Sequence, residues 1–255
     1  MKFHETPWTE LKNVDKKSTL LLFPVGSCEQ HGPHLPTFTD SLEAQAVAEG
    51  VESRLADRVM LLPTLWVGAS EHHLPFGGTL TVRTETHIAL LTELLRPLLS
   101  DGYRRLLILN AHGGNTDTIH VALRRLQQEF PEVLLTGAGF WALAAKELEA
   151  LCESPQDGPW HAGEVETSLI KTIRPDLVRE AELVDCDRPL PEVLRGLYIS
   201  RDMAQSTQDG FLGYPAQGTA EKGEKFLEAS VTRVVEVCEE LLTMDLPSVR
   251  TPKTD

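Results

Sequence analysis

The sequence Leu20-Leu21-Leu22-Phe23-Pro24-Val25 is an unbroken apolar run that ends at Gly26. Such a run is typical of a strand that is buried on both faces of a parallel sheet. It leads into Glu29-Gln30-His31-Gly32-Pro33-His34-Leu35-Pro36, which Asp40 follows. Because ligands bind beyond the carboxyl ends of strands in open α/β sheets, these carboxylate and imidazole groups indicate a functional site.

Apolar runs and helical repeats alternate along the rest of the chain. We expect strands at residues 19–25, 59–63, 105–110 and 133–137, and helices at residues 41–55, 84–99, 118–130, 141–152 and 219–242. A further helix is expected to open near His161 and to end before Pro175, whereas residues 185–218 are expected to be irregular. The alternation predicts an α/β fold, a three-layer sandwich with a mainly parallel central sheet, in a single domain over residues 1–255.

The charge of the chain limits its partners. The formal net charge is −14, from 38 acidic and 24 basic residues, which argues against nucleic acid or an anionic membrane as a partner. Small neutral or cationic substrates remain open. The first residues form no signal-peptide pattern and no apolar run approaches 20 residues, so we expect a cytoplasmic protein that does not enter a membrane.

The four cysteines are scattered and form no Cys-x-x-Cys pair. This spacing indicates neither a disulfide framework nor a zinc ribbon. We interpret Cys28 as a small residue at a strand end. The alternative, a nucleophile, would require a neighbouring base and a lowered thiol pKa.

Ionisable residues gather in three segments that follow expected strands or open an expected helix. Imidazole and carboxylate groups are the ligands that divalent first-row metals take in proteins, and two neighbouring ions require a carboxylate that bridges them. Such ligands accept zinc, manganese or iron. If the three segments converge, the candidate metal ligands are Glu29, His31, Asp40, His112 and Glu164.

The same segments resemble the signature segments of the creatininase (creatinine amidohydrolase) family. They are residues 28–36 with Asp40, Asn110-Ala111-His112-Gly113-Gly114-Asn115, and His161-Ala162-Gly163-Glu164-Val165-Glu166-Thr167-Ser168. Phe76-Gly77-Gly78-Thr79 is similar to the substrate-loop motif of that family, and Gly213-Tyr214-Pro215 with Thr219-Ala220-Glu221-Lys222-Gly223 is similar to its C-terminal segment. The resemblance covers residues 20–242.

This resemblance implies a metal-dependent hydrolase, in most members acting on amides, with two metal ions on an α/β sandwich and often a homohexamer. Glu29 and His112 would hold one ion, His31 the other, and Asp40 would bridge them. Creatininase proper has a carboxylate two residues after the histidine of the Asn-Ala-His motif, where this chain has Gly114. Glu164, similar to a glutamate of other branches, would replace it, which indicates a branch other than creatininase proper.

The expected reaction is hydrolysis of a small non-peptide or peptide-like carbon–nitrogen bond (amide, formamide or lactam) by metal-activated water, as in hydrolases that act on carbon–nitrogen bonds other than peptide bonds. His161 is expected to protonate the leaving nitrogen, and Glu166 to orient His161 or to carry its proton. Contacts with a small-molecule substrate are expected from His73, Phe76, Trp160 and Tyr214.

Other interpretations stay open at this point. The family has branches that act on formamides, on a peptide precursor and on keto-inositols, and a cyclic ketone or lactone would use the same site. A non-catalytic α/β module could bind a small ligand at the same strand ends, with Gly113-Gly114 as a phosphate-binding turn. His34 is either a ligand or a hydrogen-bonding support for one, and His72 with His73 is either an exposed loop pair or a substrate contact.

Overall fold

The core of the protein is a parallel sheet, as the sequence predicts. The computed structural model describes residues 1–155, 161–186, 192–194 and 197–248. In this part of the chain four strands pair in the order β2-β1-β3-β4, and all three pairings are parallel. The strands are β1 (Leu20–Val25), β2 (Val59–Leu61), β3 (Arg105–Asn110) and β4 (Leu134–Gly139).

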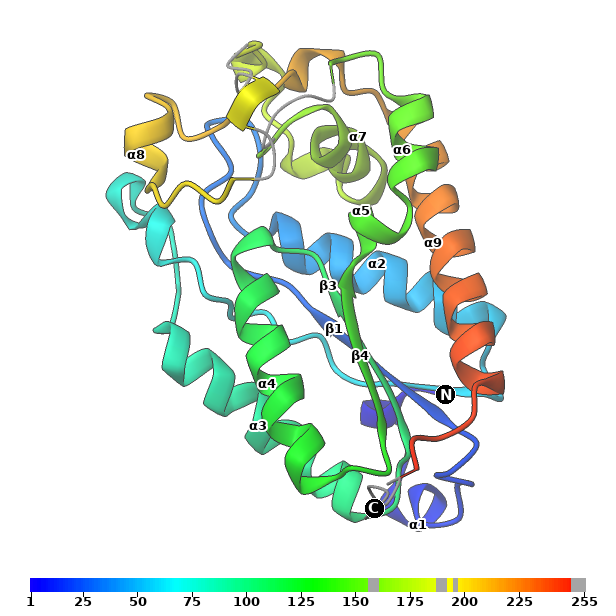
Figure 1. Cartoon of the computed structure of the whole chain (residues 1–255). Coiled ribbons are helices and arrows are strands. Elements are labelled where there is room, and N and C mark those ends of the chain that lie inside the picture. Colours follow the sequence, from blue (N-terminus) through cyan, green and yellow to red (C-terminus); the bar gives the residue numbers. More distant parts are fainter. Residues whose placement is uncertain (156–160, 187–191, 195–196, 249–255) are drawn as a thin grey trace.

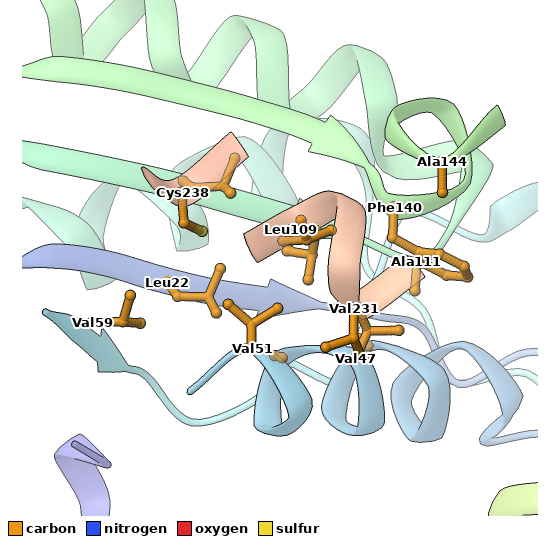
Figure 2. Close-up of a cluster of buried hydrophobic side chains, with 14 of the residues drawn as sticks. Leu22, Val47, Val51, Val59, Leu109, Ala111, Phe140, Ala144, Val231 and Cys238 are labelled. Atoms are coloured by element: carbon orange, nitrogen blue, oxygen red, sulfur yellow. The ribbon is translucent and has the colours of Figure 1, made fainter. Parts of the chain in front are cut away.

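Helices cover both faces of the sheet, which gives the three layers. On one face α2 (Thr39–Arg54) and α9 (Ala220–Thr243) pack against Leu20 and Leu22 of β1. On the other, α3 (Thr84–Ser100) and α4 (Thr116–Glu129) pack against Leu21 and Phe23. Figure 1 shows the two pairs of helices on opposite sides of the strands, and Figure 2 shows the buried cluster between β1, β3, α2 and α9. Alternate residues of one apolar strand therefore serve two cores.

The remaining elements are short. They are α1 (Trp8–Leu11), α5 (Phe140–Leu143), α6 (Ala145–Leu151), α7 (Glu164–Ile173), α8 (Met203–Ser206) and the 3₁₀ turns η1 (Phe3–Glu5), η2 (Glu71–Phe76), η3 (Gly113–Asn115), η4 (Pro175–Leu177), η5 (Glu180–Glu182), η6 (Glu192–Leu194) and η7 (Pro215–Gln217). The helix expected at residues 141–152 is two helices that meet at Ala144. No helix in the described residues is long and apolar enough to cross a membrane.

The register of the sheet positions the site. β1 and β3 pair from Leu20 with Arg105 to Val25 with Asn110, so the two strands end at the same level. The pairing continues for one residue, because Ala111 N donates to Val25 O at 2.9 Å. The segments that follow the two strands, which carry Glu29 and His112, are thereby held side by side at the carboxyl edge of the sheet.

α7, which follows the third ionisable segment, is packed tightly against α9. A Cβ atom at Gly223 of α9 would lie 1.9 Å from the carbonyl oxygen of Ser168 in α7 and 2.2 Å from Thr172 Oγ1. Only glycine allows the two backbones to approach this closely. The contact fixes α7, and with it His161 at its entrance, against the long C-terminal helix.

We expect Gly223→Ala to lower the free energy of unfolding by about 1–3 kcal/mol, because the added methyl forces α7 and α9 apart. The effect opposes the preference of helices for alanine over glycine. Urea denaturation would measure it, with Glu224→Ala at the exposed neighbouring position as the control. Equal stability of the two variants would contradict the close approach of the helices.

Candidate metal centre

The site begins with Glu29, whose carboxylate is buried just beyond β1. Ser27 Oγ donates to Glu29 Oε2 at 3.0 Å, and His112 Nε2 lies 3.1 Å from the same oxygen. Glu29 Oε1 accepts no hydrogen bond from the residues that the structure describes. A buried carboxylate oxygen without a partner is costly in a folded protein, so this atom indicates a place for a cation.

His31 faces the site with its Nε2 atom. Its Nδ1 donates to the backbone oxygen of Glu29 at 3.0 Å, while Nε2 lies 2.9 Å from Asp40 Oδ1 and 3.9 Å from Glu166 Oε1. Asp40 is buried in the first turn of α2, and its Oδ2 accepts no hydrogen bond. With the Nδ1 proton held by the backbone, Nε2 is the nitrogen of His31 that can bind a metal.

His112 faces the site with its other nitrogen. His112 Nε2 lies 3.2 Å from Ser70 Oγ, which contacts Ser27 Oγ at 2.5 Å, and Ser27 donates to Glu29. Because Glu29 can only accept, donation runs from His112 Nε2 through the two hydroxyls to the carboxylate. In the neutral ring, the lone pair of His112 is therefore on Nδ1, which lies 3.3 Å from Asp40 Oδ2.

Two asparagines hold the loop that carries His112. Asn110 accepts from His112 N at 3.1 Å and donates to His112 O at 2.7 Å. Asn115 donates to Gly26 O and accepts from Ala69 N, both at 2.9 Å. These amides join the loops after β1, β2 and β3 into one rigid rim.

His161 enters from the third segment. Its Nε2 donates to the backbone oxygen of Gln30 at 2.9 Å, and its Nδ1 lies 3.9 Å from Glu29 Oε1. Ala162, next to it, has a positive φ of 55°, unusual for a residue with a side chain. Ala162 is held there by His34 Nε2, which donates to its oxygen at 2.9 Å, and by the Glu166 carboxylate, which accepts from its N–H. This turn directs His161 into the site and delays the start of α7 to Glu164.

Among the described residues, these side chains form three overlapping groups whose candidate ligand atoms lie within 4.8 Å of one another. Asp40 and Glu29 each belong to two of the groups, as a carboxylate that bridges two ions would. The unpartnered oxygens and the inward lone pairs of the imidazoles fit divalent cations. The groups are Glu29, His31 and His161; Glu29, Asp40 and His112; and His31, Asp40 and Glu166.

Without a cation, protons on histidines balance the buried carboxylates. Burial acts to raise the pKa of Glu29, but the adjacent His112 holds it well below its usual range. Burial acts to lower the pKa of His31, but Asp40 raises it to about 10. The pKa of His112 is raised in the same way against its burial, mainly by Glu29. A bound cation would take over this balance, so metal binding would release protons from these imidazoles.

Two further carboxyl groups complete the site. Burial raises the pKa of Glu166 to about 7, and the negative charge of Asp40 adds to the effect. Burial, with Glu166 and Asp40, also raises the pKa of Glu43 well above its usual range, which keeps this buried side chain neutral. Glu43 Oε1 has no hydrogen-bond partner.

The structure places Glu164 away from the ligands that it was expected to join. Its carboxylate binds Lys222 Nζ at 2.7 Å and accepts from the backbone N–H groups of Glu153 and Ser154. Glu164 and Glu166 are two residues apart at the start of a helix, so they point to different sides. Glu166 occupies the place expected of Glu164, and Glu164 ties α7 to α9 and to the segment before it.

Three of the four expected substrate contacts lie in the described residues. His73 is buried in η2, with Nε2 3.1 Å from Glu29 Oε1, so it is not part of an exposed pair. Phe76 is the last residue of η2 and is partly buried. Tyr214 follows the residues that pair with His161 and Cys186, and it is partly exposed. Trp160 lies outside the described residues.

Some residues of the site carry no signal in isolation. Ser27 and Ser70 are small polar residues whose role depends on a contact between two loops. Glu43 gives a weak signal, because it lies three residues after Asp40 on α2 and therefore on the same side of the helix. Gln30 stands between Glu29 and His31, where its side chain would be taken for a spacer.

Comparison with known families gives a match over most of the chain. The family model described as creatininase, creatinine amidohydrolase, matches residues 4–238. The mycofactocin precursor peptide peptidase of Mycolicibacterium smegmatis is 35% identical over 218 residues, 83% of this chain and 81% of that protein. The creatinine amidohydrolase of Pseudomonas putida is 30% identical over 255 residues, 92% of this chain and 95% of that protein. The 3-dehydro-scyllo-inosose hydrolase of Thermotoga maritima is 29% identical over 189 residues, 72% and 60% of the two chains.

Solved structures give the same relationship. The crystal structure of creatinine amidohydrolase (creatininase) superposes with a TM-score of 0.80 at 27% identity and covers 95% of this chain and 98% of that one. A creatininase structure described as a manganese form has a TM-score of 0.78 at 26% identity and covers 95% of this chain and 99% of that one. A structure described as a Zn-Zn form has a TM-score of 0.77 at 26% identity and covers 95% of this chain and 98% of that one. The three-layer fold is therefore shared with proteins that hold such metals.

The two glutamates of α7 are expected to respond differently to the same substitution. Glu166→Gln should lower the metal content of the purified protein, because a carboxylate facing His31 and Asp40 is lost. Glu164→Gln should leave the metal content unchanged and lower the free energy of unfolding by roughly 1–3 kcal/mol, because Lys222 loses a charged hydrogen-bond partner. Metal analysis and urea denaturation of both variants would measure this. Metal loss in Glu164→Gln with full metal retention in Glu166→Gln would reverse the assignment.

Proposed function

Since the chain belongs to the creatininase family, we propose that it is a two-metal hydrolase that cleaves a carbon–nitrogen bond of the amide type. The observation that carries the proposal is the hydrogen bonding of the three imidazole rings that face the site. His31, His112 and His161 each commit one nitrogen to a protein acceptor and present the other to the carboxylates. Metal-binding histidines are typically held in this manner.

We assign the two ions to the two groups that share Asp40. Glu29, Asp40 and His112 would hold one ion, and His31, Asp40 and Glu166 the other. Manganese and zinc are the first metals to test, because related structures are described with them. Ions bound there would supply an activated water and would polarise the carbonyl of the substrate.

His161 is proposed as the residue that moves the proton. Burial lowers the pKa of His161 to about 3, and His31 adds to the effect, so the ring is neutral with its lone pair on Nδ1. Nδ1 can accept the proton that water loses when its oxygen attacks the carbonyl carbon. The same atom then donates this proton to the nitrogen as the carbon–nitrogen bond breaks, so His161 ends the reaction as it began.

The amide of a peptide is our first candidate substrate. The relative that is 35% identical is named as a peptidase of a precursor peptide, whereas the creatinine amidohydrolase is 30% identical. A cyclic ketone is the alternative, supported by the relative named as an inosose hydrolase. A screen of short peptides, formamides, lactams and cyclic ketones with zinc- or manganese-loaded protein would separate them. Turnover of cyclic ketones without turnover of any amide would overturn the carbon–nitrogen assignment.

Asp40→Ala is expected to remove most of the bound metal, about two ions per chain in the unaltered protein, because both sites lose their shared ligand. Metal analysis after loading and gel filtration would measure the content. Asp57→Ala, at an exposed position beyond the end of α2, is the matched control and should keep both ions. Full metal retention in Asp40→Ala would exclude the bridging assignment.

His161→Ala is expected to lower turnover of the substrate found in the screen by about 10²- to 10⁴-fold, the usual contribution of a general acid–base residue. Steady-state kinetics at saturating metal would measure the loss. His120→Ala, on the exposed side of α4, should keep normal turnover. Undiminished turnover in His161→Ala would place the proton transfer elsewhere, with Glu166 as the remaining candidate.

A further inference from the structure

The side chain of Gln30 is fixed by partners of known polarity. Gly32 N donates to Gln30 Oε1 at 3.0 Å, and Gln30 Nε2 donates to Gly210 O at 2.8 Å. Because a backbone N–H can only donate and a backbone carbonyl can only accept, these contacts assign the oxygen and the nitrogen of the amide without ambiguity. One N–H of the amide then remains.

Gln30 Nε2 also lies 3.4 Å from His161 Nε2, but that ring nitrogen donates to the Gln30 backbone oxygen and cannot accept, so the remaining N–H is directed at His73. Gln30 Nε2 lies 2.8 Å from His73 Nδ1, and both side chains are buried. Since the amide nitrogen can only donate, His73 Nδ1 is the acceptor, and the neutral ring carries its proton on Nε2. His73 Nε2 lies 3.1 Å from Glu29 Oε1 but is not aligned for a hydrogen bond, because that oxygen has no hydrogen-bond partner.

The donor and acceptor nitrogens of His73 are therefore arranged oppositely to those of the three histidines proposed to bind metal or accept a proton. His31, His112 and His161 each donate from one ring nitrogen to a protein acceptor and turn the other ring nitrogen toward the carboxylates of the site. His73 accepts from the protein and presents an N–H. The ring of His73 lies 4.6 Å from that of His161, so a donor and an acceptor stand beside each other next to Glu29.

Gln30 determines the position of the ring proton in both His73 and His161. The Gln30 side chain donates to His73 Nδ1, whereas the Gln30 backbone oxygen accepts from His161 Nε2. We propose that Gln30 is a positioning residue that keeps His73 Nε2 protonated, as a hydrogen-bond donor that does not bind metal, beside a His161 whose Nδ1 is an acceptor. The consequences for metal and substrate rest on the proposed function, whereas the protonation pattern does not.

The segment around Gly210 is part of the same arrangement. Gly210 has a φ of +78°, and a Cβ atom there would lie 2.2 Å from Gln30 Oε1. Leu212 exchanges two backbone hydrogen bonds with His161, and α8 packs on η2, which carries His73. In Figure 1, α8 lies close to the turn at residues 71–76. Because Gly210 O accepts from the Gln30 amide, the packing of residues 203–212 against η2 and His161 also fixes the orientation of that amide.

Nitrogen-15 NMR of the histidine rings tests the proposal, because two-bond proton–nitrogen spectra show which ring nitrogen carries the proton. Spectra would be recorded on metal-free and zinc-loaded protein, with signals assigned from His73→Gln and His161→Asn. We expect His73 and His161 both to be protonated on Nε2, and the ring nitrogens of His73 to show no zinc coordination. In Gln30→Leu, His73 should change to a mixture of tautomers while His161 keeps its pattern, since its partner is a backbone oxygen.

The controls separate this effect from general damage. Gln45→Leu makes the same substitution at an exposed glutamine of α2 and should change neither histidine. His87, which lies 2.7 Å from Thr118 Oγ1 between α3 and α4, reports on the fold. If Gln30→Leu unfolds, Gly210→Ala, whose methyl displaces the same amide, should give the same change at His73.

Three results would overturn the proposal: a proton on His73 Nδ1 in the unaltered protein, zinc coordination by His73, or an unchanged His73 in folded Gln30→Leu. Failure of the protein to bind zinc would refute the proposed function alone, because the metal-free spectra still determine the tautomers.

Discussion

The site depends on the parallel pairing of β1 and β3, which ends flush at Val25 and Asn110. The pairing places the loops that carry Glu29 and His112 next to each other at the carboxyl edge of the sheet. The other candidate metal ligands come from α2 and from the segment at the start of α7. β1 is buried on both sides by separate clusters of helices, so a shift of its register by one residue would exchange the side chains that fill the two cores. The hydrophobic cores thus fix the relative position of Glu29 and His112.

This arrangement is energetically costly because it buries carboxylates. Glu29, Asp40 and Glu43 are almost fully buried, and each has a carboxylate oxygen without a hydrogen-bond partner. Protons on His31 and His112 balance part of the negative charge, and Glu43 stays neutral. Strained or unsatisfied groups persist in native structures mainly where function requires them. The proposed metal centre would give a physical reason for this otherwise unfavourable group of buried carboxylates.

Much of the fold could be predicted from the sequence, because periodicity and apolar runs report directly on burial. The strand at Arg105–Asn110 was predicted with its observed bounds, and the ends of the long helices differ from the prediction by at most two residues. The predicted helix at residues 141–152 breaks at Ala144, a division that composition does not reveal. The predicted ligands Glu29, His31, Asp40 and His112 meet, since they follow adjacent strands. Glu164 does not join them, because the left-handed turn at Ala162 sets the rotation of α7, and such a turn leaves no pattern in the sequence.

The histidines show the deeper limit of sequence analysis. A sequence identifies an imidazole but not the nitrogen that carries its proton, and the proton decides whether the residue can bind a metal or donate a hydrogen bond. His112 and His73 both lie 3.1 Å from the Glu29 carboxylate, yet Ser70 accepts from one ring and Gln30 donates to the other. The two histidines therefore lie at the same distance from Glu29 but have opposite hydrogen-bonding patterns. A site of this kind is specified by the neutral residues that hold its histidines as much as by the histidines themselves.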